Sequence, residues 1–329
     1  MRKGAAYLQE LPGKLISNRV LSASSERKEY QISNPTQDEN LRSMAGFLSS
    51  VVVYCFPISF IDIGYRLPNL RTLNICFNKF HGTNPSSLHN LTKIETIRMS
   101  YNLLSGSVPP GLSGLDNIVT YNILHNQISD ITEIISDLRN STRLQYLSLA
   151  KNLIEGLLPG SIGNLSSSLL MLYLGSNKIN GQIPLSIGRL TSLTLLDISY
   201  NQLSGSIPPE IAHLKKLAVL ELTMNRLFGP VPMEIGHLTT LATLRIGQNE
   251  LAGNVSEELG LLRHVDWLDI SSISSNNLHG DIPASLFELR SLSSVLNLSH
   301  NSLTSVSIEA IGQLQDIIAI DLSKQFTQQ

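Results

Sequence analysis

Histidine, cysteine and carboxylate side chains are the groups in this sequence that could perform acid–base catalysis or bind a metal. The eight histidines are His81, His89, His125, His213, His237, His264, His279 and His300. They form neither an H-x-x-x-H motif nor a compact set with cysteine, which a metal site would need. His213 and His237 lie 24 residues apart in equivalent surroundings, which indicates an exposed polar position of a repeat.

The remaining candidate groups are two carboxylates and two cysteines. Asp266 and Asp269 flank Trp267, but no second component of an active site accompanies them. Cys55 and Cys76 could form one bridge or could each be a small buried hydrophobe, and two cysteines provide no four-ligand zinc site. We therefore expect no catalytic residue, no metal and no cofactor, and the sequence predicts a protein that is not an enzyme.

The overall charge argues against nucleic acid as a partner. The 329 residues contain 24 Lys and Arg against 26 Asp and Glu, a formal net charge of -2, whereas a nucleic-acid binder usually carries a basic face. The hydrophobic share of 42% is normal for a folded protein, but aromatic residues make up only 5%. A core must therefore be built mainly from leucine and isoleucine.

Asparagine recurs along the chain at a nearly constant spacing. The recurring residues are Asn78, Asn102, Asn126, Asn152, Asn177, Asn201, Asn225, Asn249, Asn276 and Asn301. Consecutive members are 24 to 27 residues apart, and Gln325 occupies the next position, 24 residues after Asn301. A period of this length predicts a repeat protein of about eleven units.

Each asparagine lies in a fixed frame. In the unit "LTLLDISYNQLSGSIPPEIAHLKK", residues 193–216, apolar residues precede Asn201 by 8, 5 and 3 positions. Leucine follows two positions after Asn201, glycine four after, and an apolar residue and proline six and seven after. The units around Asn152 and Asn225 repeat all eight positions, which makes the pattern very specific.

The frame predicts a coil that opens with a short strand. The Leu-x-Leu pattern has a period of two, so its apolar side chains point to one face. The asparagine follows where the chain must turn, and its amide can satisfy both backbone donors and backbone acceptors there. The glycine permits a turn with positive φ, and a short turn such as "EIAHL" then covers the outer side. Only stacking of such coils buries their apolar faces.

This frame resembles leucine-rich repeats, and "NQLSGSIPPEIAHL", "NRLFGPVPMEIGHL" and "NNLHGDIPASLFEL" resemble the plant-type repeat of 24 residues. The segment from Leu138 to Pro184 is similar to the ectodomains of plant receptor-like kinases of the flagellin-receptor and rice bacterial-blight-receptor group. The resemblance covers residues 67 to 324. It implies an α/β solenoid, a right-handed superhelix with a concave parallel β-sheet. It also implies recognition of a peptide or protein ligand at the cell membrane or outside the cell, together with a co-receptor of the same class.

The sequence also departs from that family. The start "MRKGAAYLQELPGK" has no apolar core of a signal peptide, no cysteine pair caps the array, and no kinase motif is present. We expect a truncated or diverged receptor ectodomain, acting in plant defence or development signalling. A soluble secreted inhibitor or decoy, and a receptor fragment without function, are the alternatives.

The first part of the chain does not follow the frame. Residues 1–43 are polar and aperiodic, and we expect them to be poorly ordered. The run "MAGFLSSVVVYCFPISFI", residues 44–61, is uncharged, and it could span a membrane, act as a secretion signal or pack on the array as a decayed unit. We treat 44–66 as an apolar segment or decayed cap, and 67–329 as the array with an incomplete last unit.

The predicted strands present two rows of side chains on the concave side. Six residues before each asparagine, the row changes from threonine to larger apolar side chains in the middle of the array. Eleven strands about 4.8 Å apart make a face roughly 50 Å long, enough for an extended peptide of about 14 residues. A ridge of aromatic, apolar and charged side chains is a candidate ligand-binding site. Its residues are Tyr146, Met171, Tyr173, Leu195, Asp197, Glu221, Arg245 and Trp267. Plain surface is the alternative, because sheet propensity also favours such residues.

Five N-x-Ser/Thr sequons could carry glycans if the chain is secreted. They are Asn90, Asn140, Asn164, Asn254 and Asn297. We expect Asn90 and Asn164 on the outer turns, Asn254 near an edge, and Asn297 on a strand, where a glycan would block the concave side.

The segment "LDISSISSNNLHGDIP" contains a doubled triplet, Ile270–Ser272 and Ile273–Ser275, which lengthens one repeat by three residues. Three extra residues cannot remain in a strand without moving alternate side chains to the wrong face. Either Ile270 keeps the core position and the second triplet loops out, or Ile273 takes that position. We expect a bulge beside Trp267.

Overall fold

The structure is a computed structural model that describes residues 50–52, 63–84, 86–108, 111–271, 276–304 and 308–325. The chain divides into two units, residues 1–41 and 42–329, and every described residue lies in the second. The expectation for residues 1–43 therefore concerns residues outside the described part, as does the expected bulge at 272–275. Cys55, and with it the bridge to Cys76, also lies outside.

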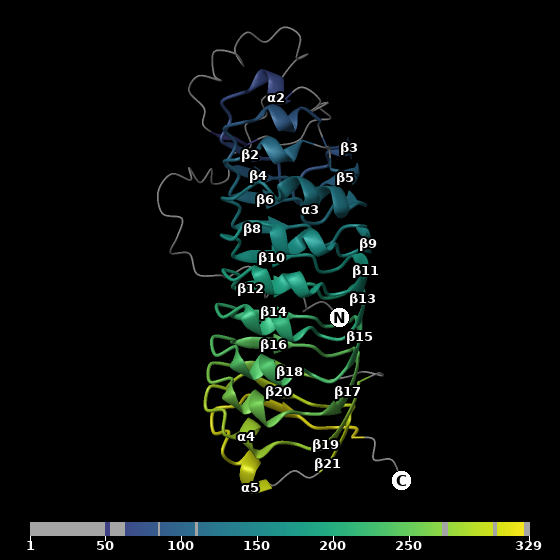
Figure 1. The fold of residues 1–329 in the computed structure, drawn as a ribbon, viewed down its shortest axis with the longest axis vertical. Coiled ribbons are helices and arrows are strands. Elements are labelled where there is room, and N and C mark those ends of the chain that lie inside the picture. Colours follow the sequence, from purple (N-terminus) through teal and green to yellow (C-terminus); the bar gives the residue numbers. More distant parts are fainter. Residues whose placement is uncertain are drawn as a thin grey trace. The chain divides into compact units, whose positions relative to one another are not determined.

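The Leu-x-Leu segments form one parallel sheet, with one strand from each coil (Figure 1). Its strands, in spatial order, are β1 (Ser50–Val52), β2 (Thr72–Asn74), β4 (Thr96–Arg98), β6 (Thr120–Asn122), β8 (Tyr146–Ser148), β10 (Met171–Tyr173), β12 (Leu195–Asp197), β14 (Val219–Glu221), β16 (Thr243–Arg245), β18 (Trp267–Asp269), β20 (Val295–Asn297) and β22 (Ala319–Asp321). Each strand is three residues long and pairs in register with the next, so equivalent positions of successive repeats become direct neighbours.

The apolar run contributes the first strand of this sheet. Within it, Ser50, Val51 and Val52 form β1 and pair in parallel with Thr72, Leu73 and Asn74. The other residues of the run are not described. In the part of the chain that is described, no helix has the length and apolar character needed to cross a membrane.

The glycine segments form a second row of short parallel strands after each asparagine turn. These strands are β3 (His81–Thr83), β5 (Leu103–Gly106) and β7 (Gln127–Ile128), followed by β9 (Glu155–Leu157), β11 (Lys178–Gln182), β13 (Gln202–Gly205), β15 (Arg226–Gly229), β17 (Glu250–Asn254), β19 (Asn277–Asp281) and β21 (Ser302–Thr304). The glycine of the frame has positive φ, 78° at Gly205 and 82° at Gly229, as the sequence predicted.

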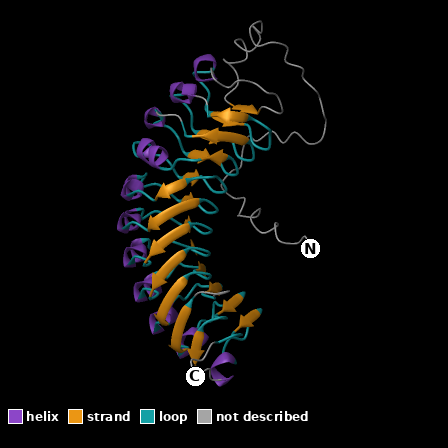
Figure 2. Cartoon of the chain, turned by 90° about the vertical axis from the view of Figure 1, so that its right-hand side faces the viewer, coloured by secondary structure: helices purple, strands orange, loops and turns teal. Residues whose placement is uncertain are grey.

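Short helices cover the outer side of the coils, opposite the main sheet (Figure 2). They are α2 (Ile63–Arg66), η2 (Ser86–Asn90), η3 (Leu112–Gly114), α3 (Thr132–Leu138), η4 (Gly160–Asn164), η5 (Leu185–Arg189), η6 (Pro209–His213), η7 (Met233–His237), η8 (Glu257–Leu261), α4 (Ala284–Phe287) and α5 (Ile308–Ile311). Those labelled η are single 3-10 turns, and η4, η5, η6 and η7 begin directly after the frame proline, whose fixed φ leads the chain out of the extended segment.

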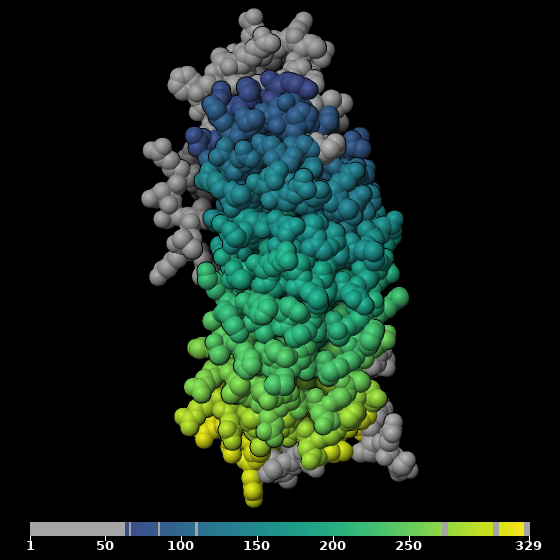
Figure 3. Space-filling view, viewed as in Figure 1, coloured from purple at the N-terminus to yellow at the C-terminus, as the bar shows by residue number. Residues whose placement is uncertain are grey.

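The core is a continuous column of leucine and isoleucine between the sheet and the helices. In the unit around Asn201, the apolar frame residues Leu193, Leu196, Ile198, Leu203 and Ile207 are at most 1% exposed. The coils follow one another in chain order along the unit (Figure 3). Each coil therefore buries its apolar face against the previous and the next coil, which is the fold predicted from the frame.

The asparagines link neighbouring coils through their side-chain amides. Asn201 Nδ2 donates to the carbonyls of Ile198 in its own coil and Leu174 in the coil before, each at 3.1 Å. Its Oδ1 accepts from the backbone N–H of Ile179 at 2.9 Å. Gln325 makes the same set of bonds, with Oε1 accepting from Leu303 N and Nε2 donating to Leu298 O. Each side chain thus satisfies both kinds of backbone group at a turn.

Among the described residues, the residue directly before each recurring asparagine, and the one before Gln325, has a left-handed backbone that the frame alone does not predict. These residues are Phe77, Tyr101, His125, Lys151, Ser176, Tyr200, Met224, Gln248, His300 and Lys324, with φ between 52° and 59°. The conformation lets the backbone N–H of Tyr200 reach the carbonyl of Thr223 in the next coil at 2.8 Å. The inter-coil bond offsets a conformation that non-glycine residues otherwise avoid. The rings of Phe77, Tyr101 and His125 stack at 4.6 and 4.8 Å.

The residues around the doubled triplet show which isoleucine keeps the frame. Ile270 is fully buried, and its carbonyl and that of Ser271 accept from Asn276 Nδ2. In the unit of Asn201, the equivalent carbonyls belong to Ile198 and Ser199, which lie three and two residues before Asn201. Ile270 therefore occupies the core position, and the additional residues fall within 272–275.

Candidate binding face

The main sheet presents two columns of side chains away from the core, because the central residue of each strand points inward. In β10, β12, β14 and β16 the middle residue is buried and its neighbours on both sides are half-buried. The first column contains Tyr146, Met171, Leu195, Val219, Thr243 and Trp267. The second column contains Ser148, Tyr173, Asp197, Glu221, Arg245 and Asp269.

The first column is mainly apolar and accessible. Met171, Leu195 and Val219 are half-buried on adjacent strands, and Trp267 is 36% exposed. At one end, the rings of Tyr146 and Tyr173 lie 5.5 Å apart between centroids. The column thus offers a strip of apolar and aromatic surface along the array, of a kind that marks binding surfaces.

The second column is mainly charged. Arg245 NH1 donates to Glu221 Oε1 at 2.9 Å, and its guanidinium carbon lies 5.0 Å from the centroid of the Trp267 ring. Asp197 Oδ1 accepts from the backbone N–H and hydroxyl of Ser199. Asp269 makes the same two bonds with Ser271. Among described residues, neither Asp197 nor Asp269 has a basic side chain within ion-pair distance.

Partial burial disfavours the ionised form of two carboxyl groups in the second column, Glu221 and Asp197. Burial raises the pKa of Glu221 to about 7, although Arg245 lowers it, and the carboxylate of Asp197 raises it further. Burial also raises the pKa of Asp197, against the lowering effects of Ser199, Arg245 and Lys151. The concave surface therefore holds carboxylates that lack full hydration and lack a full set of basic partners.

The structure brings all eight predicted ligand residues together on the six neighbouring strands β8 to β18. Sequence reasoning left out Val219, Thr243 and Asp269, which complete the two columns between and beside the predicted residues. The signal that could have included them is their identical position in the frame. Ser148 shares that position but is 1% exposed, so it contributes no accessible surface.

The sequon asparagines differ in accessibility. Asn140, Asn164 and Asn254 are exposed, while Asn90 and Asn297 are half-buried. Asn297 lies on β20 of the main sheet, and its Oδ1 accepts from Ser299 N and Oγ. A glycan on Asn297 would therefore start on the same sheet as the two columns.

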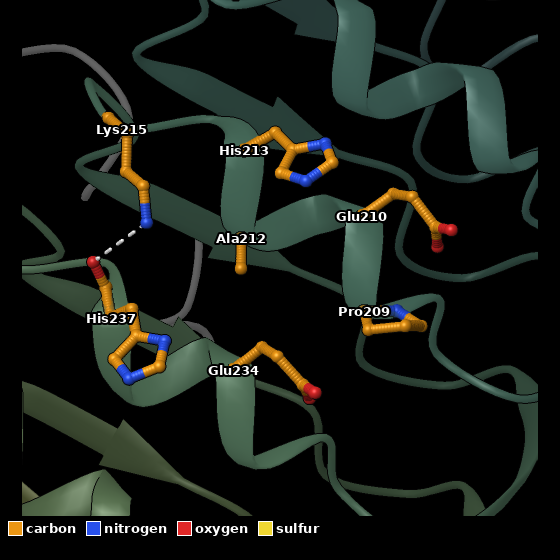
Figure 4. Close-up of a pocket in the computed structure, with 7 residues that line it drawn as sticks. All are labelled: Pro209, Glu210, Ala212, His213, Lys215, Glu234 and His237. Carbon is orange, nitrogen blue, oxygen red and sulfur yellow. Dashed lines mark hydrogen bonds between the residues drawn. The ribbon is translucent and has the colours of Figure 1, made fainter.

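An open hollow of about 280 Å³ lies on the outer face between η6 and η7 (Figure 4). Its lining residues are Pro209, Glu210, Ala212, His213, Lys215, Glu234 and His237. Lys215 Nζ donates to the backbone carbonyl of His237 at 3.4 Å. In the described part of the chain, no group of three or more His, Cys, Asp or Glu side chains could hold a metal ion.

An alanine lines this hollow at a position where other outer helices have glycine. Glycine occupies the equivalent position in η4, η5, η7 and η8, and a Cβ at Gly188 or Gly236 would lie 2.4 or 2.0 Å from a carbonyl oxygen of the next helix. In η6 the position is Ala212, whose methyl faces the hollow. A methyl at this position cannot approach the next helix as closely as glycine does elsewhere, so packing is a sufficient reason for the hollow.

Comparison with known proteins places this arrangement in a family. A model of a leucine-rich repeat region matches residues 161–328, which is 168 of the 329 residues, and leucine-rich repeat models match residues 68–128 and 143–165. The chain belongs to the leucine-rich-repeat family.

The leucine-rich repeats of this chain are homologous to those of plant receptor-like kinases. They are 45% identical over 73 residues to the LRR receptor-like serine/threonine-protein kinase EFR of Arabidopsis thaliana, covering 22% of this chain and 7% of the relative. They are 52% identical over 59 residues to the receptor kinase-like protein Xa21 of Oryza sativa subsp. japonica, covering 18% and 6%. The matches thus span less than a tenth of these relatives.

Solved structures of the same fold include proteins with different roles. The plant peptide hormone receptor RGFR1 in complex with RGF2 has a TM-score of 0.58 at 27% identity, covering 80% of this chain and 52% of that chain. A plant ice-binding protein has a TM-score of 0.62 at 26% identity, covering 74% and 76%. The leucine-rich-repeat fold therefore does not fix the function, which depends on the residues of the binding face.

Proposed function

We propose that this leucine-rich-repeat array is a non-catalytic recognition module that binds a peptide or protein ligand on the two columns of the main sheet. The proposal is supported by one observation above the others. The parallel register places large apolar, aromatic and charged side chains next to one another from β8 to β18, on the side that the helices leave open.

The comparisons support a receptor-type role. Homologues of these repeats are plant receptor kinases, and a protein of the same fold is a peptide hormone receptor. We accordingly propose action outside the cell or at its membrane, in plant defence or development signalling. A co-receptor of the same repeat class would share the ligand, and glycans on the exposed sequons would leave the main sheet open.

A binding experiment with the full chain tests this function. The chain is expressed with a secretion signal and panned against displayed random peptides of 14 residues. Changing Tyr173→Asp and Leu195→Asp together should abolish peptide capture and leave the melting temperature nearly unchanged. The matched control is Leu185→Asp with Phe228→Asp, because both side chains are exposed and lie away from the main sheet. Undiminished capture by the first variant would refute the proposed face.

A further inference from the structure

The two columns of the main sheet differ in the ligand chemistry that each would favour. Among the described residues, Met171 and Leu195 of the apolar column keep accessible surface, and the charged column carries more negative than positive side chains. On the four adjacent strands β12 to β18 the charged column carries Asp197, Glu221 and Asp269 against the single guanidinium of Arg245.

Arg245 is already engaged within the fold. It pairs with Glu221, and its guanidinium lies over the Trp267 ring, so it is held at the β18 side of Glu221. Asp197 lies on the opposite side of Glu221, and among the described residues its carboxylate accepts hydrogen bonds only from Ser199. The negative charge of the column is therefore least compensated between Asp197 and Glu221.

Both of these carboxylates are partly removed from water. The side chain of Glu221 is 17% exposed, and Asp197 is half-buried. A carboxylate in this setting gains more from a cationic partner than a fully solvated one, because solvent screens the attraction less. In the apolar column, Leu195 lies on the same strand as Asp197 and Met171 is its neighbour on β10, and their surface would gain from apolar cover.

We infer that the ligand of this face is an extended peptide that places a lysine or arginine between Asp197 and Glu221 and an apolar side chain over Met171 and Leu195. The inference rests on the proposed function, since it names the class of ligand for the same face. The negative charge of Asp197 and Glu221 favours a basic residue in the ligand. The neighbouring apolar column favours an apolar residue close to it.

The geometry sets the spacing of the two ligand residues. Neighbouring strands lie about 4.8 Å apart and the two columns are two residues apart along each strand, so the two subsites are separated by roughly 8 Å. Side chains on one face of an extended peptide recur about every 6.8 Å. The basic and apolar residues of the ligand should therefore be about two positions apart.

The test uses the peptides selected from the random 14-residue library with the full chain. We expect enrichment of Lys or Arg about two residues from a large apolar residue. Asp197→Asn with Glu221→Gln should weaken the selected peptides about tenfold or more, in line with the loss of charge pairs at interfaces. Glu133→Gln with Glu257→Gln, which removes two exposed charges from the outer helices, should leave the affinity unchanged.

A second measurement does not depend on how the variants fold. Replacing the selected Lys or Arg of the peptide by norleucine should weaken binding to the unaltered chain, and replacement by glutamate should weaken it further. The inference would be overturned, while the proposed function stands, if the selected peptides lack a basic residue or bind equally well after both replacements, and are still lost with Tyr173→Asp and Leu195→Asp. Absence of any peptide sensitive to changes on this face would overturn both.

Discussion

The side chain of Asn249 accepts a hydrogen bond from the backbone N–H of Leu227 at 3.1 Å, although Leu227 lies 22 residues earlier, in the neighbouring coil. The same side chain donates to the carbonyls of Leu222, Ile246 and Gly247. With only 1% of Asn249 exposed, water cannot replace these bonds. This asparagine therefore joins two coils through four backbone groups.

Asn249→Ala should lower the free energy of unfolding by about 3 kcal/mol, because it leaves one buried donor and several carbonyls without their partner. Urea unfolding followed by circular dichroism measures the change. The control is Asn277→Ala, at an exposed asparagine that is not one of the recurring asparagines, which should have a small effect. Equal effects of the two substitutions would contradict the bridging role.

Gly236→Ala should destabilise the array by about 1–3 kcal/mol, because the added methyl would lie 2.0 Å from the carbonyl oxygen of Glu258 and force the outer helices apart. The control is Gly114→Ala, whose added methyl meets no atom within 4 Å. That control should be neutral or slightly stabilising, since alanine restricts the unfolded chain. Thermal unfolding of both variants checks the contrast, and a stable Gly236→Ala would show that the helices can separate freely.

Asn84→Val should stabilise the protein by about 1–3 kcal/mol. Asn84 is 3% exposed at the core position that Val108 occupies in the next coil, and within the described residues neither polar atom of its side chain has a hydrogen-bond partner. The reverse exchange, Val108→Asn, should destabilise by a similar amount. Chemical denaturation of the two variants tests this pair, and a loss of stability in Asn84→Val would reveal a partner for the amide.

Glu221 should make stability depend on pH between about 4.5 and 7. Its pKa is raised to about 7 from 4.5, so within this window the folded state binds a proton that the unfolded state has lost. The contribution of Glu221 to stability is therefore largest at low pH and falls as the pH rises through the window. Relative to the unaltered chain, Glu221→Gln should gain up to about 3 kcal/mol between pH 5 and pH 8. Urea unfolding midpoints at the two pH values measure the gain in stability. Glu257→Gln is the control for the loss of a carboxylate. A stability difference between Glu221→Gln and the unaltered chain that stays constant with pH would contradict the raised pKa.

Deleting Ser271–Ile273 should raise the melting temperature. The deletion restores the sequence Ile-Ser-Ser-Asn and the spacing that joins a buried isoleucine to its asparagine in the other coils, while Ile270 and Asn276 already hold their frame positions. Differential scanning calorimetry provides the measurement. A lower melting temperature would mean that the additional residues make stabilising contacts.

The sequence predicted the coil because its determinants are local. Leu196 and Ile198 set the strand face, Asn201 the turn and Gly205 the positive φ, and all four lie within ten residues of one another. Repetition of the same frame then leaves stacking as the arrangement that buries the apolar faces. The parallel sheet, the buried asparagines and the outer helices therefore follow from the sequence.

The contacts between coils required the tertiary structure. The Glu221–Arg245 pair, the contact of Arg245 with Trp267 and the closeness of Gly236 to Glu258 all join residues of neighbouring coils. The repeat period predicts which residues become neighbours in adjacent coils. Side-chain rotamers, the spacing of the helices and solvent exposure decide whether those residues form an interaction, clash or stay exposed. For that reason the sequence alone determined the solenoid and the location of its open face, whereas the uneven charge of that face, the hollow beside Ala212 and the buried amide of Asn84 were decided by packing.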